Sequence, residues 1–121
     1  MTRDCLDYLQ DIIDAMADAQ SFVQGITYED FVKDKRTINS VLRSLEVVGE
    51  ATKNVPDDVR QRFPLIPWRS LAGMRDKLIH QYFGVNLRAV WDTVQDDLPS
   101  IRPAVEAVRE ALLREKTGGK R

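Results

Sequence analysis

The sequence contains very few of the residues that build metal centres and covalent cross-links. Its 121 residues include one cysteine, Cys5, and one histidine, His80. A lone cysteine cannot form a disulfide within the chain, and one thiol with one imidazole supplies too few ligands for a zinc site. We therefore expect no metal and no cofactor, and we expect Cys5 to act as a small apolar residue of the first helix.

Long apolar runs and a strong charge of either sign are also absent from the sequence. No segment approaches the roughly 20 apolar residues of a membrane span, and the polar residues 1–4 are unlike a signal peptide. These features predict a cytoplasmic protein without a membrane partner. The formal net charge of −1 argues against the strongly basic surface of a dedicated nucleic-acid coat, although a small basic cleft can still bind phosphate.

Apolar residues recur at spacings of three and four along most of the chain, which predicts an all-α protein. The expected elements are a first long helix ending at Gly25, helices over 28–33, 35–54, 68–83 and 87–97, a helical turn over 57–63, and a last helix from Pro99. Mostly short connections favour one antiparallel helical bundle over residues 1–115. Residues 116–121, with two glycines and three basic residues, are expected to form a flexible C-terminal tail.

Capping and breaking residues set the expected helix ends. Thr27 with Asp30 resembles a capping box, with aspartate in place of the usual glutamate. Asn86 is a candidate cap for the helix that follows it. Pro99 follows an Asp-Leu pair and predicts a break before the last helix.

The predicted helix 68–83 carries the residues best suited to chemistry. At about 100° per residue, Tyr82 falls about 20° from Arg75, on an arc that is mostly apolar. A buried guanidinium is costly unless a carboxylate or an anionic ligand meets it. Arg75 is therefore either half of a structural salt bridge or a clamp for phosphate oxygens, which its fork of donors matches.

His80 is the best candidate for acid–base chemistry near neutral pH. It is turned about 140° from Arg75, with Asp76 one turn before it. Asp76 can accept a hydrogen bond from one imidazole nitrogen and leave the other for a substrate. The alternative is an inert surface histidine. Because one histidine cannot be acid and base at once, a second copy of the chain is expected to complete the site.

A polar stripe on the helix over 35–54 offers supporting residues: Arg43, Glu46 and Glu50. The simpler interpretation is an exposed ladder of ion pairs, each stabilising the helix by about 0.2–0.5 kcal/mol. The alternative is that a glutamate pairs with Arg75, or that Arg43 adds positive charge to a shared cleft. Val47, an apolar residue in this stripe, hints at contact with another subunit.

Residues 75–82, RDKLIHQY, fit the R-x4-H-x-Y motif of HepT-like toxins in the HEPN superfamily. The flanking segments are similar to that family as well: LEVVGEA at 45–51, IPWR at 66–69, GMR at 73–75, YFGV at 82–85, VW at 90–91 and DLP at 97–99. The resemblance runs from about Leu6 to Leu112. Asp76 departs from it, because asparagine commonly follows the motif arginine.

This resemblance implies a HEPN-type helical bundle that forms a homodimer, with a metal-independent endoribonuclease site in the cleft between subunits. It implies Arg75 and His80 as the catalytic residues. It also implies a partner, an antitoxin that is a minimal nucleotidyltransferase of the MNT type, which transfers AMP to Tyr82. RNA would be the substrate, and products would carry a 2′,3′-cyclic phosphate and a 5′-hydroxyl.

A second function class stays open on the sequence. The chain could be a non-catalytic helical module that binds a nucleotide and pairs with the nucleotidyltransferase. The intact set of Arg75, His80 and Tyr82 favours the enzyme. The near-neutral charge favours the binding module.

Overall fold

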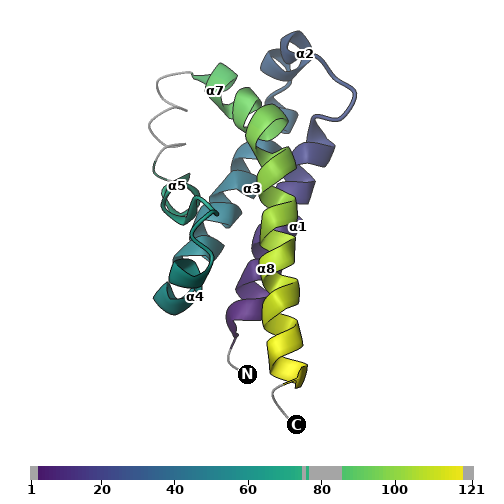
Figure 1. Cartoon of the computed structure of the whole chain (residues 1–121). Coiled ribbons are helices and arrows are strands. Elements are labelled where there is room, and N and C mark those ends of the chain that lie inside the picture. The colour runs from purple at the N-terminus through teal and green to yellow at the C-terminus, as the bar shows by residue number, and fades with distance from the viewer. Residues whose placement is uncertain (1–2, 75, 77–85, 119–121) are drawn as a thin grey trace.

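The computed structural model describes residues 3–74, 76 and 86–118. Every element in that part of the chain is helical, which confirms the predicted all-α class. In Figure 1, α1 (Cys5–Phe22) and α8 (Leu98–Gly118) run in opposite directions, with both chain ends at one end of the bundle. Among the described helices, none combines the length and apolar character that crossing a membrane requires.

Side-chain hydrogen bonds cap the first turn of each of the first three helices. Asp4 and Asp7 form a capping box at the start of α1, and Gly25 leaves that helix with a φ of 78°, a conformation that glycine adopts without strain. Thr27 and Asp30 form the predicted capping box of α2 (Tyr28–Lys33). Asp34 then caps α3 (Lys35–Lys53) by accepting from two backbone N–H groups.

The helix expected over 68–83 begins at Trp68 as predicted, but the structure interrupts it at Gly73. After α4 (Asp57–Arg62), α5 covers only Trp68–Ala72 and ends at Gly73. The N–H of Gly73 still bonds the carbonyl of Arg69 at 3.0 Å, and then the chain turns. Glycine has a low helix propensity, which explains an interruption at this position. Met74 and Asp76 are again helical, and residues 75 and 77–83 of the expected helix lie outside the described residues.

The break expected at Pro99 is also wrong. Asn86 caps α7 (Leu87–Asp92) as predicted, and the chain then passes through a π-helical turn, η1 (Thr93–Asp97), directly into α8. The N–H of Leu98 bonds the carbonyl of Thr93, five residues back. Proline in an α-helix clashes with the carbonyl four residues earlier. Pro99 directly follows this turn, in which the hydrogen bonding spans five residues, and the helix continues through it.

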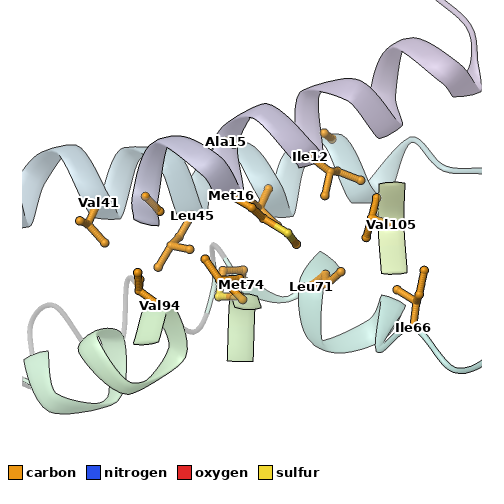
Figure 2. Close-up of a cluster of buried hydrophobic side chains, with 14 of the residues drawn as sticks. Ile12, Ala15, Met16, Val41, Leu45, Ile66, Leu71, Met74, Val94 and Val105 are labelled. Carbon is orange, nitrogen blue, oxygen red and sulfur yellow. The ribbon is translucent and has the colours of Figure 1, made fainter. Parts of the chain in front are cut away.

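The core lies where α3 and α8 pack against α1. Side chains from α1, α3, α5, η1 and α8 meet in it (Figure 2), among them Ile12, Met16, Leu45, Leu71, Val94 and Val105. Thr52 is fully buried, and its hydroxyl donates to the carbonyl of Val48 at 2.7 Å, so its polar atom is satisfied. The packing of α3 and α8 on α1 thus holds these three helices together as one unit.

The last helix extends further than the sequence predicts. We expected a flexible tail from Lys116, but α8 continues to Gly118, and Lys116 Nζ lies 3.3 Å from Asp4 Oδ2 at the start of the chain. The boundary of the single domain at residue 115 stays a prediction, and residues 119–121 lie outside the described residues.

Candidate functional site

The structure describes four of the seven predicted site residues, namely Arg43, Glu46, Glu50 and Asp76. The other three, Arg75, His80 and Tyr82, lie outside the described residues. What the structure does define is how the chain enters and leaves the motif. Asp76, within the motif, is exposed.

The chain enters the motif from a point held in the core. The indole N–H of Trp68 donates to the carbonyl of Phe63 at 2.9 Å, and this bond holds the start of α5 against the end of α4. Leu71 and Met74, one turn apart, are both buried, and Figure 2 shows Met74 directed into the hydrophobic cluster. The residue immediately before Arg75 is therefore fixed by packing.

The chain leaves the motif at an equally well-held point. Asn86 Oδ1 accepts from the N–H of Ala89 at 3.1 Å and fixes the first turn of α7. Further along α7, the guanidinium carbon of Arg88 lies 4.8 Å from the centre of the Tyr28 ring. Trp91 packs against that ring edge-on at 5.9 Å. The helix after the motif is thus anchored on α2.

A cavity of about 460 Å³ lies beside the entry point. It separates α5 from η1 and the start of α8, and Gly73 and Met74 form part of its wall. Arg69 and Asp97 line it as well, so one cation and one anion border a space next to the motif. Small-molecule sites commonly have volumes of roughly 300–1,000 Å³, and this cavity falls within that range.

The polar stripe of α3 forms ion pairs within its own helix. Arg43 Nη1 lies 3.9 Å from Glu46 Oε2, and Lys53 Nζ lies 3.8 Å from Glu50 Oε1. The Arg43 side chain is 76% exposed, so this pair contributes little to stability. These distances agree with the ladder of ion pairs. They leave the predicted roles of these residues in the site as predictions.

The same stripe also borders two hollows between α1 and α3. Arg43 and Val47 line both of them, and Asp11 of α1 faces them from the other side. Val47 is half-buried, as expected of an apolar residue at the floor of a groove. The groove lies between α1 and α3, and Asp76 of the motif is not among its lining residues.

Sequence reasoning missed the residues that position the motif. Trp68 and Met74 touch no substrate atom in our prediction, yet they hold the entry point. The spacing of three between Leu71 and Met74 was a usable signal of a buried face that runs up to the motif. The hydrogen bond from Trp68 to Phe63 had no such signal, because it depends on the path of the loop between α4 and α5.

The chain is an all-helical bundle with an R-x4-H-x-Y segment between two anchored helices. These features define a class of protein, and comparison with known families identifies that class. The profile of the family described as "Ribonuclease HepT-like" matches residues 12–108, which include the whole motif. The chain belongs to this HepT-like ribonuclease family, as the resemblance predicted.

Individual relatives agree with that assignment. "Probable ribonuclease HepT" of Thermococcus cleftensis is 48% identical over 110 residues, which cover 91% of this chain and 100% of the relative. A "Putative RNase" of Methanocaldococcus jannaschii is 45% identical over 88% of each chain. Another, of Caldanaerobacter subterraneus, is 44% identical over 90% of this chain and 95% of the relative. No solved structure gives a significant match.

Proposed function

We propose that this chain is the toxin of a toxin–antitoxin pair and acts as a metal-independent endoribonuclease. The observation that carries the proposal is the family match over residues 12–108, within which residues 75–82 keep the complete R-x4-H-x-Y motif. The names of the relatives support ribonuclease activity as the chemistry.

The chemistry requires only the motif residues. His80 removes the proton from a ribose 2′-hydroxyl, whose oxygen attacks the adjacent phosphorus, or it donates a proton to the leaving 5′-oxygen. Arg75 stabilises the charge that develops on the non-bridging phosphate oxygens. The phosphorus–O5′ bond breaks, which leaves a 2′,3′-cyclic phosphate and a 5′-hydroxyl. Asp76, which is exposed beside Arg75, would orient the imidazole of His80.

We further propose that the active form is a homodimer, because each chain supplies a single histidine and the reaction uses both an acid and a base. The groove between α1 and α3 is bordered by the exposed guanidinium of Arg43 and by the carboxylates of Asp11, Asp14 and Asp18. The apolar Val47 in this polar setting supports a subunit contact. In this arrangement Arg43, Glu46 and Glu50 act as supporting residues near the shared cleft. Light scattering should give twice the chain mass at micromolar concentration.

Substitution of the motif tests the catalytic proposal. His80→Ala and Arg75→Ala should each abolish cleavage of single-stranded RNA, while Gln61→Ala, an exposed residue of α4, should cut like wild type. EDTA should leave the rate unchanged. If EDTA stops cleavage while His80→Ala still cuts, the mechanism is wrong. If wild type binds nucleotides but cuts no RNA, the chain is the non-catalytic binding module.

Control by an antitoxin is the third part of the proposal. A nucleotidyltransferase partner would use ATP, and the Tyr82 oxygen would attack the α-phosphorus, form a phosphodiester and release pyrophosphate. The added AMP would occupy the position beside Arg75 at which the RNA phosphate binds. Intact-mass spectrometry after incubation with the partner and ATP should show AMP units on wild type and none on Tyr82→Phe. Unchanged modification of that variant would place the acceptor elsewhere, for example on Tyr8 or Tyr28.

A further inference from the structure

A cavity of about 540 Å³ opens where α1 ends. Figure 1 shows this end of α1 at the end of the bundle away from the chain termini. Its walls come from the last turns of α1, the turn around Gly25, α7, η1 and the first turns of α8. Its polar and aromatic lining residues are Gln20, Ser21, Gln24, Trp91, Gln95 and Arg102. Asp76 is not among the lining residues, so this cavity is distinct from the described part of the motif.

The charge of the cavity differs from that of the protein as a whole. The chain has a net charge of −1, yet the described residues that line the cavity include one cation, Arg102, and no carboxylate. Arg102 Nε lies 3.5 Å from Glu106 Oε1, which is close enough for an ion pair but leaves the buried Nε without a hydrogen bond to the described residues. The Arg102 side chain as a whole is 36% exposed, so the guanidinium remains accessible to an anion.

Gln20 adds a polar carboxamide to the same cavity. Its Oε1 is buried and has no hydrogen-bond partner among the described residues, which is uncommon for a buried acceptor. A polar ligand that reaches this carboxamide would therefore satisfy an unpaired acceptor. Gln20, Gln24 and Gln95 each offer a donor and an acceptor side by side, the pattern that matches the edge of a nucleobase.

The aromatic wall of the cavity is held rigidly. Trp91 packs edge-on against Tyr28 at 5.9 Å and against Phe31 with ring centres 5.3 Å apart. These two contacts come from α2 and fix the plane of the indole. Bases of single-stranded RNA commonly stack on aromatic side chains held in this way.

We propose that this cavity binds one unpaired nucleotide of the RNA substrate, a subsite that rests on the proposed ribonuclease function. The glutamine carboxamides hold the edge of the base, Trp91 offers a stacking surface, and Arg102 binds the phosphate. Because the carboxamides distinguish base edges, this subsite determines which RNA sequence is preferred for cleavage.

Binding measured without cleavage tests the subsite. In a His80→Ala background, the anisotropy of fluorescein-labelled 12-nucleotide single-stranded RNAs gives the Kd. Arg102→Gln and Gln20→Leu should each weaken binding about tenfold, since each removes one base or phosphate contact. Arg114→Gln on α8 and Gln61→Leu on α4 are matched controls that lie outside the cavity and should bind like the parent. If Gln20→Leu fails to fold, Gln24→Leu, an exposed residue of the same wall, takes its place.

Free nucleotides provide the second arm of the experiment. Titration with AMP, GMP, CMP or UMP should shift the indole N–H signal of Trp91 in a ¹H–¹⁵N spectrum, but more weakly than RNA does. If a mononucleotide binds as tightly as RNA, the ligand is a free nucleotide and the RNA subsite is wrong. If the cavity variants bind RNA as the controls do, the subsite is wrong even when Arg75 and His80 cut RNA. If wild type cuts no RNA but binding still depends on Arg102, the ribonuclease proposal fails and the nucleotide site stands.

Discussion

The indole nitrogen of Trp68 donates a hydrogen bond to the carbonyl oxygen of Phe63 across 2.9 Å. This bond closes the loop between α4 and α5, in which Ile66 is buried and Leu65 is 98% exposed. The loop leads into α5, which precedes the motif in the chain. A single side chain therefore both fills the core and sets the position from which the motif begins.

Trp68→Phe should destabilise the protein by about 1–2 kcal/mol, because it keeps an aromatic ring but leaves the Phe63 carbonyl without its donor. For a chain of this size the melting temperature should fall by roughly 3–8 °C, as measured by circular dichroism. Leu65→Ala, in the same loop, should change stability by no more than about 0.5 kcal/mol. Equal melting temperatures for Trp68→Phe and wild type would show that the hydrogen bond contributes nothing.

Met74→Ala should cost roughly 2–5 kcal/mol in urea unfolding, because it leaves a cavity in the core beside Leu71. Met74→Leu keeps the volume and should cost less than about 1.5 kcal/mol. Met16→Ala is the matched control, since Met16 is fully buried on α1, away from the motif in the sequence. At a temperature where all three remain folded, Met74→Ala should cut RNA more slowly than Met16→Ala. Equal cleavage rates for Met74→Ala and Met16→Ala would show that packing of Met74 does not position the motif.

Stability at low pH should depend on the pair formed by Arg62 and Glu115, which joins α4 to α8. Arg62 Nη1 lies 3.0 Å from Glu115 Oε1, and the hydrogen bond from Arg62 lowers the pKa of Glu115 below its ordinary value of 4.5. The unfolded chain therefore binds the proton more readily than the folded chain. The stabilisation is complete above pH 4.5 and is lost as the pH falls through the lowered pKa.

Urea midpoints of wild type and Glu115→Gln at pH 7 and pH 3 test this dependence. Wild type should be the more stable of the two at pH 7, and the difference should shrink at pH 3. Glu110→Gln, an exposed residue of the same helix, is the control for removing one carboxylate. A difference that is the same at both pH values would exclude the ion pair as its cause.

The Cys5 thiol should be a slow nucleophile. Burial raises the pKa of Cys5, and the nearby carboxylates of Asp4 and Asp58 raise it further. At pH 8 a smaller fraction is thiolate, so alkylation by iodoacetamide should be slower in the folded protein than in urea. Mass spectrometry at timed intervals measures both rates. An equal or faster rate in the folded protein would contradict this account.

Local patterns predicted the helix ends because the interactions that make them are local. The caps at Thr27 and Asn86 each join residues three apart, and both are present in the structure. Pro99 misled the prediction because the π-helical turn that accommodates it depends on hydrogen bonds across five residues. Gly73 was expected within a helix, although its low propensity was visible in the sequence.

The residues of the candidate sites also differ in whether the sequence alone could reveal them. The motif residues Arg75, His80 and Tyr82 are close in sequence, so their spacing could be interpreted directly. The nucleotide cavity brings Gln20 together with Trp91 and Arg102, which are about 70 to 80 positions later in the chain. No periodicity in the sequence connects these residues, since they meet only through the tertiary packing of α1, α7 and α8.

The π-helical turn Thr93–Asp97 sets the rotation of α8 about its axis relative to α7. Each residue rotates a helix by about 100°, so the length of this turn decides which side of α8 faces α1. Deleting one residue from it would swing Val105 out of the core and Arg102 out of the cavity together. The number of residues in this turn is therefore constrained separately from their identity, because a change in length would reposition every side chain that follows.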